Sequence, residues 1–570
     1  MSSTPTSASA SPVQGESLAA LSRFWKFDLQ AGFLVFLIAL PLCLGISIAS
    51  GFPAVAGIFT AIVGSLVATI ISNSELTIKG PAAGLIVIVL GAMLDFGFTG
   101  DIKDPASIAA YRLVLGVGVV AGVIQVAFGM LRSGVLGEFF PTAAVHGLLA
   151  SIGVIIVSKQ AHVALGVKPS GQGPLALIGE IPHSVMNLNP EIAMIGAVSL
   201  LILFGLPFLK NKTVRKMPAQ MLVVLVAIPL GLYFDLDHTH TYSFYGHQYE
   251  VAPRFLVDVP KNLFGAIVFP DFSSLSTATG WKWVLMFSLI GSLESLLSSK
   301  AVELIDPWRR KTNMNRDLVA VGVGNTLAAA IGGLPMISEI VRSKANVDNG
   351  AHSRFGNLYH GLFLLGFVAL LPGLIHEIPL AALAAMLVYT GFRLASPREF
   401  MHMYHAGREQ LLVFATTIVA VLATDLLIGI LVGIALELTI NLFNGAPIRS
   451  LFRPTVEIDR QPDGAIILSV KHAAVFSSWI SLRKRIERAD EGQEVVLDFS
   501  DTRLVDHTVM EKLHELQREF AERDARLVIT GLEGHRAISR HPRSARKKKK
   551  PVTIPDLLTS DSPDTAAIQP

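Results

Sequence analysis

The sequence contains almost no cysteine and few charges. Cys43 is the only cysteine in 570 residues, which excludes an intramolecular disulfide and any metal site built from several thiolates. Charged residues make up 16% of the chain and the formal net charge is +3, so the composition indicates no general attraction to nucleic acid. The sequence also lacks a nucleophile and base in a recognisable motif and a phosphate-binding loop, and we therefore expect no enzymatic activity.

Hydrophobic residues, in contrast, are abundant. They account for 51% of the chain, and the mean hydropathy is +0.54, outside the usual range of soluble proteins. Apolar runs close to the roughly 20 residues needed to cross the hydrocarbon layer recur along the chain, which predicts a polytopic membrane protein. We expect about fourteen spans, at about residues 29–49, 53–72, 81–97, 110–131, 141–158, 190–209, 217–235, 281–299, 317–332, 338–350, 357–374, 379–394, 409–424 and 426–443.

The two ends of the chain differ from the spans. Residues 1–21 are rich in Ser, Ala, Thr and Pro without a cationic start and apolar core, so we expect a disordered tail and no cleaved signal. Towards the C-terminus, AIILSV and VVLDFS alternate as strands do, and MEKLHELQREFAERDAR has a helical charge pattern. We predict a transmembrane domain over 22–445, a small cytoplasmic α/β domain over 446–541 and a disordered basic tail over 542–570.

Basic residues in the loops predict the orientation. The segments KNKTVRK, DPWRRKTNMNR and RLASPREFMHMYHAGRE all fall on the same side as Arg23 and Lys26 when the spans alternate. By the positive-inside rule this side is the cytoplasm. We therefore expect both termini in the cytoplasm, and we expect the membrane to be the inner membrane of a bacterium.

The predicted spans form two sets of seven, and the third span of each set is interrupted. The pair Gly80 and Pro81 precedes the first interrupted span, and GGLP at 332–335 precedes the second. An odd number of spans inverts the second set relative to the first. This is typical of inverted-repeat transporters, in which two half-helices meet near the midplane with their N-termini facing the substrate. We predict repeats at about 28–236 and 281–443, although either break alone could be a packing kink.

Several of these segments resemble one family. The stretch NRDLVAVGVGNTLAAAIGGLPMISEIVRSKANVDNGAHSRFGNLYHG is similar to the signature region of the SulP inorganic anion transporters, and LTIKGPAAG, SLIGSLESLLSSKAVE and IPLAALAAMLVYTGFRL resemble that family's third, eighth and twelfth spans. VVLDFSDTRLVDHTVMEKLHEL resembles the STAS domain that such transporters carry. The resemblance covers about residues 22–535. It implies a core domain, a gate domain and assembly as a homodimer. It implies no cofactor, although a sodium ion could bind.

The resemblance also implies a binding site for the anion. Arg342 matches an arginine that the family places near the anion in the tenth span, and Ser343 matches a hydroxyl residue there. Arg342 could instead pair with Glu339 on the same helix, and Ser343 and Ser338 could serve as caps. Glu339 itself departs from the small or hydroxyl residue of relatives, and its charge would weaken the positive field of Arg342.

The break before the third span adds backbone groups to this site. Gly80 and Pro81 would free the amides of Ala82 and Ala83 to point towards the anion at the positive end of a helix dipole. Proline at a first helical position costs no hydrogen bond. Lys79 would either attract a doubly charged substrate or extend to the cytoplasmic surface.

Glu294 is a carboxylate within an apolar span, at a position where the family places an acid beside the substrate. We predict that it carries a proton or holds a sodium ion, with Ser298 as a second oxygen ligand, unless it only neutralises Arg342. The sequence therefore favours a cation-coupled secondary transporter of sulfate or bicarbonate with an elevator-like movement. An uncoupled exchanger or channel, a nucleobase permease and a membrane sensor are the alternatives.

Overall fold

A computed structural model describes residues 17–169, 171, 173–208, 217–258, 264–462, 466–489, 494–521 and 525–549. Contacts between Cα atoms divide the chain into two compact units. Unit 1 comprises Met1–Gly137, His146–Glu399 and Thr417–Ile430, and unit 2 comprises Glu138–Val145, Phe400–Thr416 and Leu431–Pro570. Residues 1–16 of the predicted tail 1–21 lie outside the described residues. Residues 17–21 belong to the first helix.

The predicted spans correspond to helices. Seven helices among the described residues are long and apolar enough to cross a membrane, and shorter apolar helices accompany them. The helices of this region are α1 (Ser17–Ala49), α2 (Ala56–Ile71), α3 (Ile86–Asp95), α4 (Pro105–Met130), α5 (Thr142–Ala164), α6 (Pro174–Met186), α7 (Pro190–Gly205), α9 (Ala219–Tyr233), α10 (Ala278–Ile305), α11 (Met314–Ala330), α12 (Ile340–Asp348), α13 (Phe355–Leu370), α14 (Pro372–His376), α15 (Leu380–Leu394), α16 (Pro397–Ala406), α17 (Arg408–Ala423) and α18 (Leu426–Phe443).

Helices α6 and α16 were not expected from the sequence. They contain 13 and 10 residues, so they are too short to give an apolar run of the length that a span requires. A hairpin of β2 (His240–Phe244) and β3 (His247–Val251) lies between α9 and α10, in the segment that separates the two predicted sets of seven spans. The span prediction therefore located the long apolar helices and several short ones, and it missed α6 and α16.

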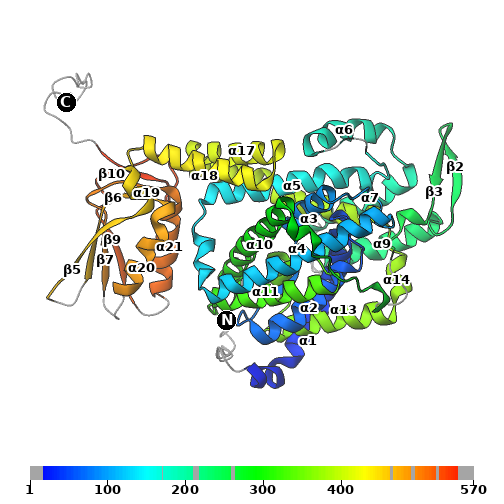
Figure 1. The fold of residues 1–570 in the computed structure, drawn as a ribbon, viewed down its shortest axis with the longest axis horizontal. Coiled ribbons are helices and arrows are strands. Elements are labelled where there is room, and N and C mark those ends of the chain that lie inside the picture. Colours follow the sequence, from blue (N-terminus) through cyan, green and yellow to red (C-terminus); the bar gives the residue numbers. More distant parts are fainter. Residues whose placement is uncertain are drawn as a thin grey trace, which may run out of the picture. The chain divides into compact units, whose positions relative to one another are not determined.

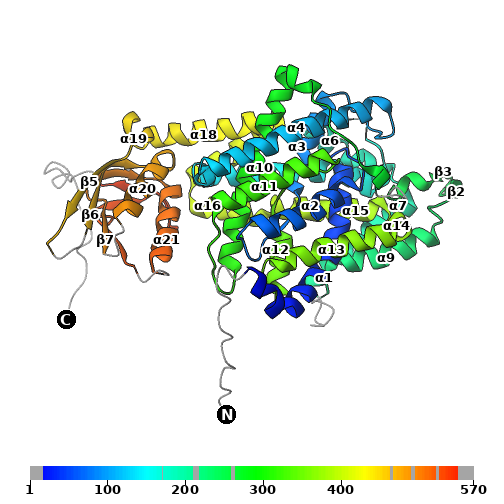
Figure 2. The ribbon, with the colours of Figure 1, turned by 60° about the horizontal axis from the view of Figure 1, so that its bottom comes forward.

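Small residues allow α4 and α11 to pack closely. A Cβ added to Gly122 would lie 2.9 Å from the carbonyl oxygen of Gly322, and one added to Gly322 would lie 2.6 Å from the amide nitrogen of Val126. Contacts this short leave no room for side chains, so the two helix backbones approach as they do at small-residue interfaces in membranes. Helices α4, α10 and α11 lie side by side in both views (Figure 1 and Figure 2), and together they support the two interrupted segments.

Unit 2 contains a seven-stranded sheet in which strands β10, β11, β8, β6, β7 and β9 follow one another and β5 pairs with β6. The neighbouring pairs β8–β6, β6–β7 and β7–β9 are parallel. These strands are β5 (Thr455–Arg460), β6 (Ile466–Ala474), β7 (Val495–Asp498), β8 (Thr502–Val505), β9 (Leu527–Thr530), β10 (His535–Ala537) and β11 (Arg546–Lys548).

The apolar core of this sheet packs against two helices. The residues of α20 (Trp479–Ala489) and α21 (His507–Ala521) that face the strands include Trp479, Leu482 and Leu513, which are buried with Leu468 and Leu497 of the sheet. Figure 1 shows both helices beside β6, β7 and β9. A short helix, α19 (Ile448–Phe452), precedes the sheet. The predicted α/β character of this part of the chain is confirmed, and its β-rich architecture fits the STAS resemblance.

One boundary of this domain was wrong. The basic stretch that we expected to begin a disordered tail at residue 542 contains β11, in which Arg546 pairs with Val505 and Lys547 with Leu504 of β8. Strand β8 would otherwise be an exposed sheet edge, and β11 satisfies the hydrogen-bonding groups of that edge. Charge composition alone does not show such pairing. The rest of the predicted tail, from residue 550, lies outside the described residues.

Candidate anion-binding site

The two interrupted segments pair directly with each other. Strand β1 (Ile78–Pro81) and strand β4 (Met336–Glu339) are antiparallel, with Lys79 opposite Ser338 and Gly80 opposite Ile337. A short helical turn, Ala83–Leu85, and α3 follow β1, and α12 follows β4 directly. The strands thus satisfy each other's backbone groups where neither chain segment is helical, as membrane depth requires, and the pairing brings the two half-helix starts together.

Arg342 lies in the first turns of α12 and is 1% exposed. Its Nη2 donates to the carbonyl oxygen of Pro81 over 3.3 Å, and its Nη1 lies 3.5 Å from the Sγ of Cys43 on α1. A Cβ on Gly80 would collide with Nη1, so glycine leaves room for the guanidinium in this position. Nε of Arg342 is buried without a hydrogen-bond partner, which leaves this cation with donor capacity for another acceptor.

The carboxylate of Glu339 enters the same place. The N–H of Ala83, one of the amides that we predicted to face the anion, and the guanidinium of Arg342 both act on it electrostatically. Ala82 is extended and its carbonyl oxygen accepts from the amide of Leu85 over 3.2 Å. Glu339, Arg342 and the amide of Ala83 therefore lie in one site, and both the pairing of Glu339 with Arg342 and the anion position at Ala83 stay predictions.

Glu294 approaches from α10. A Cβ on Gly84 would collide with its carboxylate, and Oε2 of Glu294 is buried without a hydrogen-bond partner. Glu339 lies near enough to act on it electrostatically. Ser298, the predicted second ligand, is one helical turn further along α10 and half-buried. An unpartnered carboxylate oxygen at this depth is suited to bind a proton or a cation, and the role of Ser298 stays a prediction.

Lys79 is buried in an ion pair that the sequence did not reveal. Its Nζ lies 2.7 Å from Oδ1 and 2.9 Å from Oδ2 of Asp317 on α11, and both side chains are 1% exposed. Lys79 therefore does not extend to the surface, and its charge is already compensated. The hydroxyl of Ser299 donates to Asp317 over 2.8 Å and that of Ser72 over 2.5 Å. A lone acid at the start of an apolar span was the available signal, because such a group needs a partner.

The two serines of the predicted site have structural partners. The hydroxyl of Ser338 contacts Lys79 and donates to Asp317 over 3.2 Å. The hydroxyl of Ser343 accepts from the amide of Ile78 over 2.8 Å and donates to the carbonyl oxygen of Glu339 over 2.5 Å. Both serines thus connect β4 and α12 to neighbouring segments by hydrogen bonds. Anion binding by either hydroxyl stays a prediction.

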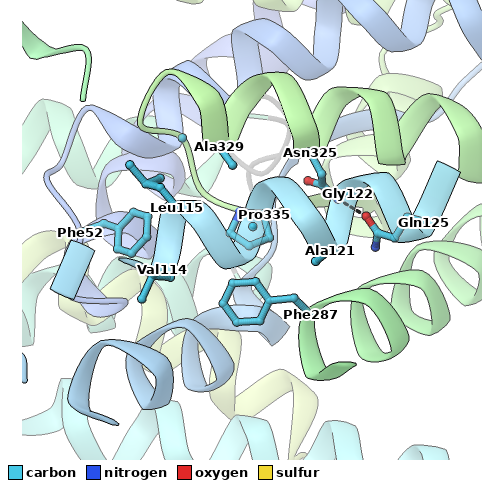
Figure 3. Close-up of a pocket in the computed structure, with 12 residues that line it drawn as sticks. Phe52, Val114, Leu115, Ala121, Gly122, Gln125, Phe287, Asn325, Ala329 and Pro335 are labelled. Atoms are coloured by element: carbon cyan, nitrogen blue, oxygen red, sulfur yellow. Dashed lines mark hydrogen bonds between the residues drawn. The ribbon is translucent and has the colours of Figure 1, made fainter. Parts of the chain in front are cut away.

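A small cavity adjoins the site between α4, α10 and α11 (Figure 3). Gln125 and Asn325 point into it and share a hydrogen bond of 2.7 Å. Asn325 also accepts from the amide of Met336 in β4 over 2.5 Å. The remaining lining is apolar or glycine, with Phe52, Val114, Leu115, Gly118, Ala121, Gly122, Phe287, Ala329, Gly333 and Pro335. Because this lining has no charged side chain, the cavity is a poor place for an anion.

A buried guanidinium and two carboxylates lie where the paired half-helices begin, an arrangement typical of membrane transporters. The family model described as "Sulfate permease family" matches residues 25–417. The chain is 23% identical over 520 residues to the "Putative sulfate transporter YvdB" of Bacillus subtilis (strain 168), covering 90% of this chain and 92% of that protein. It is also 23% identical over 407 residues to the bicarbonate transporter BicA of Picosynechococcus sp., covering 71% of this chain and 68% of that one.

A solved structure shares the fold. The murine Solute Carrier 26 family member A9 anion transporter in the inward-facing state matches with a TM-score of 0.64 and 15% identity, over 92% of this chain and 90% of that chain. The chain belongs to the sulfate permease family and is an anion-transporting membrane protein. The predicted family, the fold class of a 7+7 helical membrane domain with a C-terminal α/β domain, and the expectation of no enzymatic activity are confirmed.

Proposed function

We propose that the protein is a secondary active transporter of an inorganic oxyanion, sulfate or bicarbonate. The observation that carries this proposal is the β1–β4 pair, which holds the buried Arg342 where two half-helices begin. A guanidinium presents planar, paired donors that match an oxyanion better than any other side chain does. Gly80, Pro81 and Ala82 would supply backbone groups beside it. The named activities of YvdB and BicA, sulfate and bicarbonate transport, support this substrate class.

Charge balance favours coupling to a cation. With Glu294 and Glu339 both ionised, the site carries one positive and two negative charges before any substrate enters. A substrate anion with one negative charge, at about 5 Å from one carboxylate, is repelled by that carboxylate by about 3 kcal/mol at an effective dielectric constant of about 20. A proton or a sodium ion on Glu294 removes that repulsion. We therefore propose that Glu294, whose Oε2 is buried and unpartnered, binds the coupling cation, with Ser298 as a second oxygen ligand for sodium.

The movement that we propose is elevator-like. Helices α1 to α4 and α10 to α13 pack densely around β1 and β4, and this group would move as the core that carries the anion. The neighbours α7, α9 and α15 meet α1 through an apolar surface that includes Ile38, Leu42, Val223, Ala382 and Met386. An apolar surface suits sliding, because hydrophobic contact is non-directional.

Orientation and assembly complete the proposal. We propose an inner bacterial membrane with both termini in the cytoplasm, on the basis of the basic loops, and a homodimer, on the basis of the family. Lipid and the inorganic anion are then the partners of each protomer. The orientation can be tested by protease access to the C-terminal domain in inverted and right-side-out vesicles.

The test of the transport proposal is uptake into proteoliposomes. Purified protein is reconstituted, and labelled sulfate and labelled bicarbonate are supplied separately, with and without an inward sodium or proton gradient. We expect accumulation of one of the two anions above its external concentration with one of the two gradients. The Glu294→Gln variant should lose the accumulation, whereas Glu250→Gln, a change at an exposed carboxylate of the β2–β3 hairpin, should retain it.

The alternatives give different results in the same assay. Equilibration without accumulation would support an uncoupled exchanger or channel. Unchanged gradient-driven accumulation in Glu294→Gln would overturn the assignment of the coupling site. No flux of either anion, with the protein intact, would contradict the proposed substrate class and reopen the nucleobase and sensor alternatives.

A further inference from the structure

The ammonium group of Lys79 is surrounded by oxygen atoms. Its N–H groups donate to Oδ1 and Oδ2 of Asp317, over 2.7 and 2.9 Å, and to the hydroxyl of Ser338. The hydroxyl of Ser299 lies 2.8 Å from Oδ2 of Asp317 and 2.8 Å from Oγ of Ser338, and that of Ser72 donates to Oδ1 of Asp317 over 2.5 Å. An ammonium group has three donors, so each of them has an acceptor in a carboxylate or a hydroxyl group.

This cluster lies at the junction of the two interrupted segments. Lys79 belongs to β1 and Ser338 to β4, and the two residues are opposite each other in the strand pairing. Ser299 of α10 and Asp317 of α11 approach from the supporting helices. All four residues are at most 1% exposed. One positive charge therefore connects both strands of the β1–β4 pair with two of the helices that support them.

The same oxygen atoms suit a free cation. Hard metal cations bind to oxygen ligands, carboxylates above all, and one positive charge balances the single carboxylate of this cluster, so the equivalent free ion is monovalent. Lys79 supplies that charge from its own side chain, which neither enters from solution nor leaves. The carboxylate of Glu294, in contrast, has a buried oxygen without a hydrogen-bond partner. Asp317 thus has a covalently attached cation, whereas Glu294 has an open position.

We propose that Asp317, Ser299 and Ser338 form a site for a monovalent cation and that the ammonium group of Lys79 is its permanent occupant. The natural protein therefore takes up no inorganic cation at this junction. Coupling is left to the exchangeable cation proposed at Glu294. That last consequence rests on the proposed function, whereas the occupancy of the site by Lys79 does not.

The test removes the ammonium group and offers free cations in its place. Lys79→Ala leaves the carboxylate and the hydroxyl groups of the site intact. Purified full-length protein is unfolded thermally in detergent, in sodium, ammonium or choline chloride at equal ionic strength. Relative to choline, which is too large for the site, sodium or ammonium should raise the unfolding temperature of Lys79→Ala more than that of the wild type. The additional rise should be about 2 °C at a cation concentration about a hundred times its dissociation constant.

Two controls locate the effect at this site. The double variant Lys79→Ala/Asp317→Asn lacks the carboxylate, so it should respond to the cations only as the wild type does. Lys282→Ala, which changes a lysine of α10 that is 41% exposed, should also respond as the wild type does. An additional rise of the same size in the double variant, or no additional rise in Lys79→Ala with either cation, would overturn the inference.

A second comparison tests the natural protein and needs no variant of Lys79. Because Lys79 excludes free ions from the site, the wild type and Asp317→Asn should be stabilised by sodium to the same extent. Stabilisation of the wild type that Asp317→Asn loses would overturn the inference, even if Lys79→Ala and its replacement Lys79→Ser do not fold. Unfolding is measured without transport, so an absence of anion flux would contradict the proposed function and leave this result unaffected.

Discussion

The buried ion pair between Lys79 and Asp317 gives the most quantitative prediction. Both side chains are 1% exposed, and Asp317 also accepts hydrogen bonds from Ser72 and Ser299. Asp317→Asn removes the counter-charge and leaves the ammonium group of Lys79 buried without it. Removal of one partner from such a pair costs about 3–5 kcal/mol of unfolding free energy, whereas replacement of both partners by apolar residues of similar size is nearly neutral.

A double-mutant cycle measures this coupling. Purified wild type, Asp317→Asn, Lys79→Met and the double variant are compared by thermal unfolding in detergent. The unfolding entropy of 570 residues, at about 2.1 cal/mol/K each, is about 1.2 kcal/mol/K. Each single variant should therefore unfold roughly 2.5–4 °C below the wild type. The double variant should recover most of that loss, because no uncompensated charge remains.

Loss of this ion pair should also reduce anion uptake. Lys79 stands opposite Ser338 in the β1–β4 register, so loss of the ion pair loosens the strands that carry the anion site, and we expect reduced uptake in both single variants. Single variants as stable as the wild type, or a double variant that is destabilised by the sum of the two single losses, would refute the reasoning.

Three further predictions concern other parts of the chain. Gly84→Ala places a Cβ against the carboxylate of Glu294, so gradient-driven uptake should fall at least about tenfold while the folded fraction is retained. Burial raises the pKa of Asp506 to about 6; since this carboxyl then binds a proton more tightly in the folded than in the unfolded state, the stability of the protein should rise as the pH falls from about 7 to about 5. The Val509 amide, which donates to Asp506, should then show increased hydrogen-exchange protection after correction for intrinsic rates. Asp506→Asn should abolish this increase. Trp479→Ala removes a side chain that is 1% exposed and should destabilise the C-terminal domain by about 3–5 kcal/mol. The midpoint of denaturant unfolding, followed by far-ultraviolet circular dichroism because the variant loses a tryptophan, measures this change.

Much of the fold could be predicted because a membrane imposes strong local rules. Length and hydropathy located the long helices, and the glycine and proline breaks located the half-helices whose strands pair as β1 and β4. The pairing of the two breaks followed from their matching places in two sets of seven spans, which depends on order in the sequence and not on side-chain detail.

The site itself was predictable only in outline. Arg342 and Glu294 were identified by their charge within apolar segments, but the partner of Lys79 lies 238 residues away, and no spacing in one sequence reveals a contact of that range. Ser343 was expected to face the anion, although its hydroxyl joins Ile78 to Glu339. A short polar side chain can serve a ligand or the backbone, and only the three-dimensional surroundings decide between them.

The start of the predicted C-terminal tail was wrong for a related reason. A run of basic residues predicts a solvated segment, but a strand at a sheet edge needs only backbone groups from its partner, and β11 provides them with Arg546 and Lys547. Tertiary pairing therefore overrode composition at this position.

The most direct test of the central claim is the effect of Arg342→Gln on anion uptake. Reconstituted protein is assayed with labelled sulfate and bicarbonate beside a control, Arg254→Gln, which changes an arginine that is 61% exposed outside the site; thermal unfolding verifies that both variants are folded. Because loss of a buried charge-assisted partner costs about 2–5 kcal/mol, we predict at least about tenfold less uptake for Arg342→Gln and wild-type uptake for Arg254→Gln. Wild-type uptake by folded Arg342→Gln would contradict the assignment of this arginine to the anion.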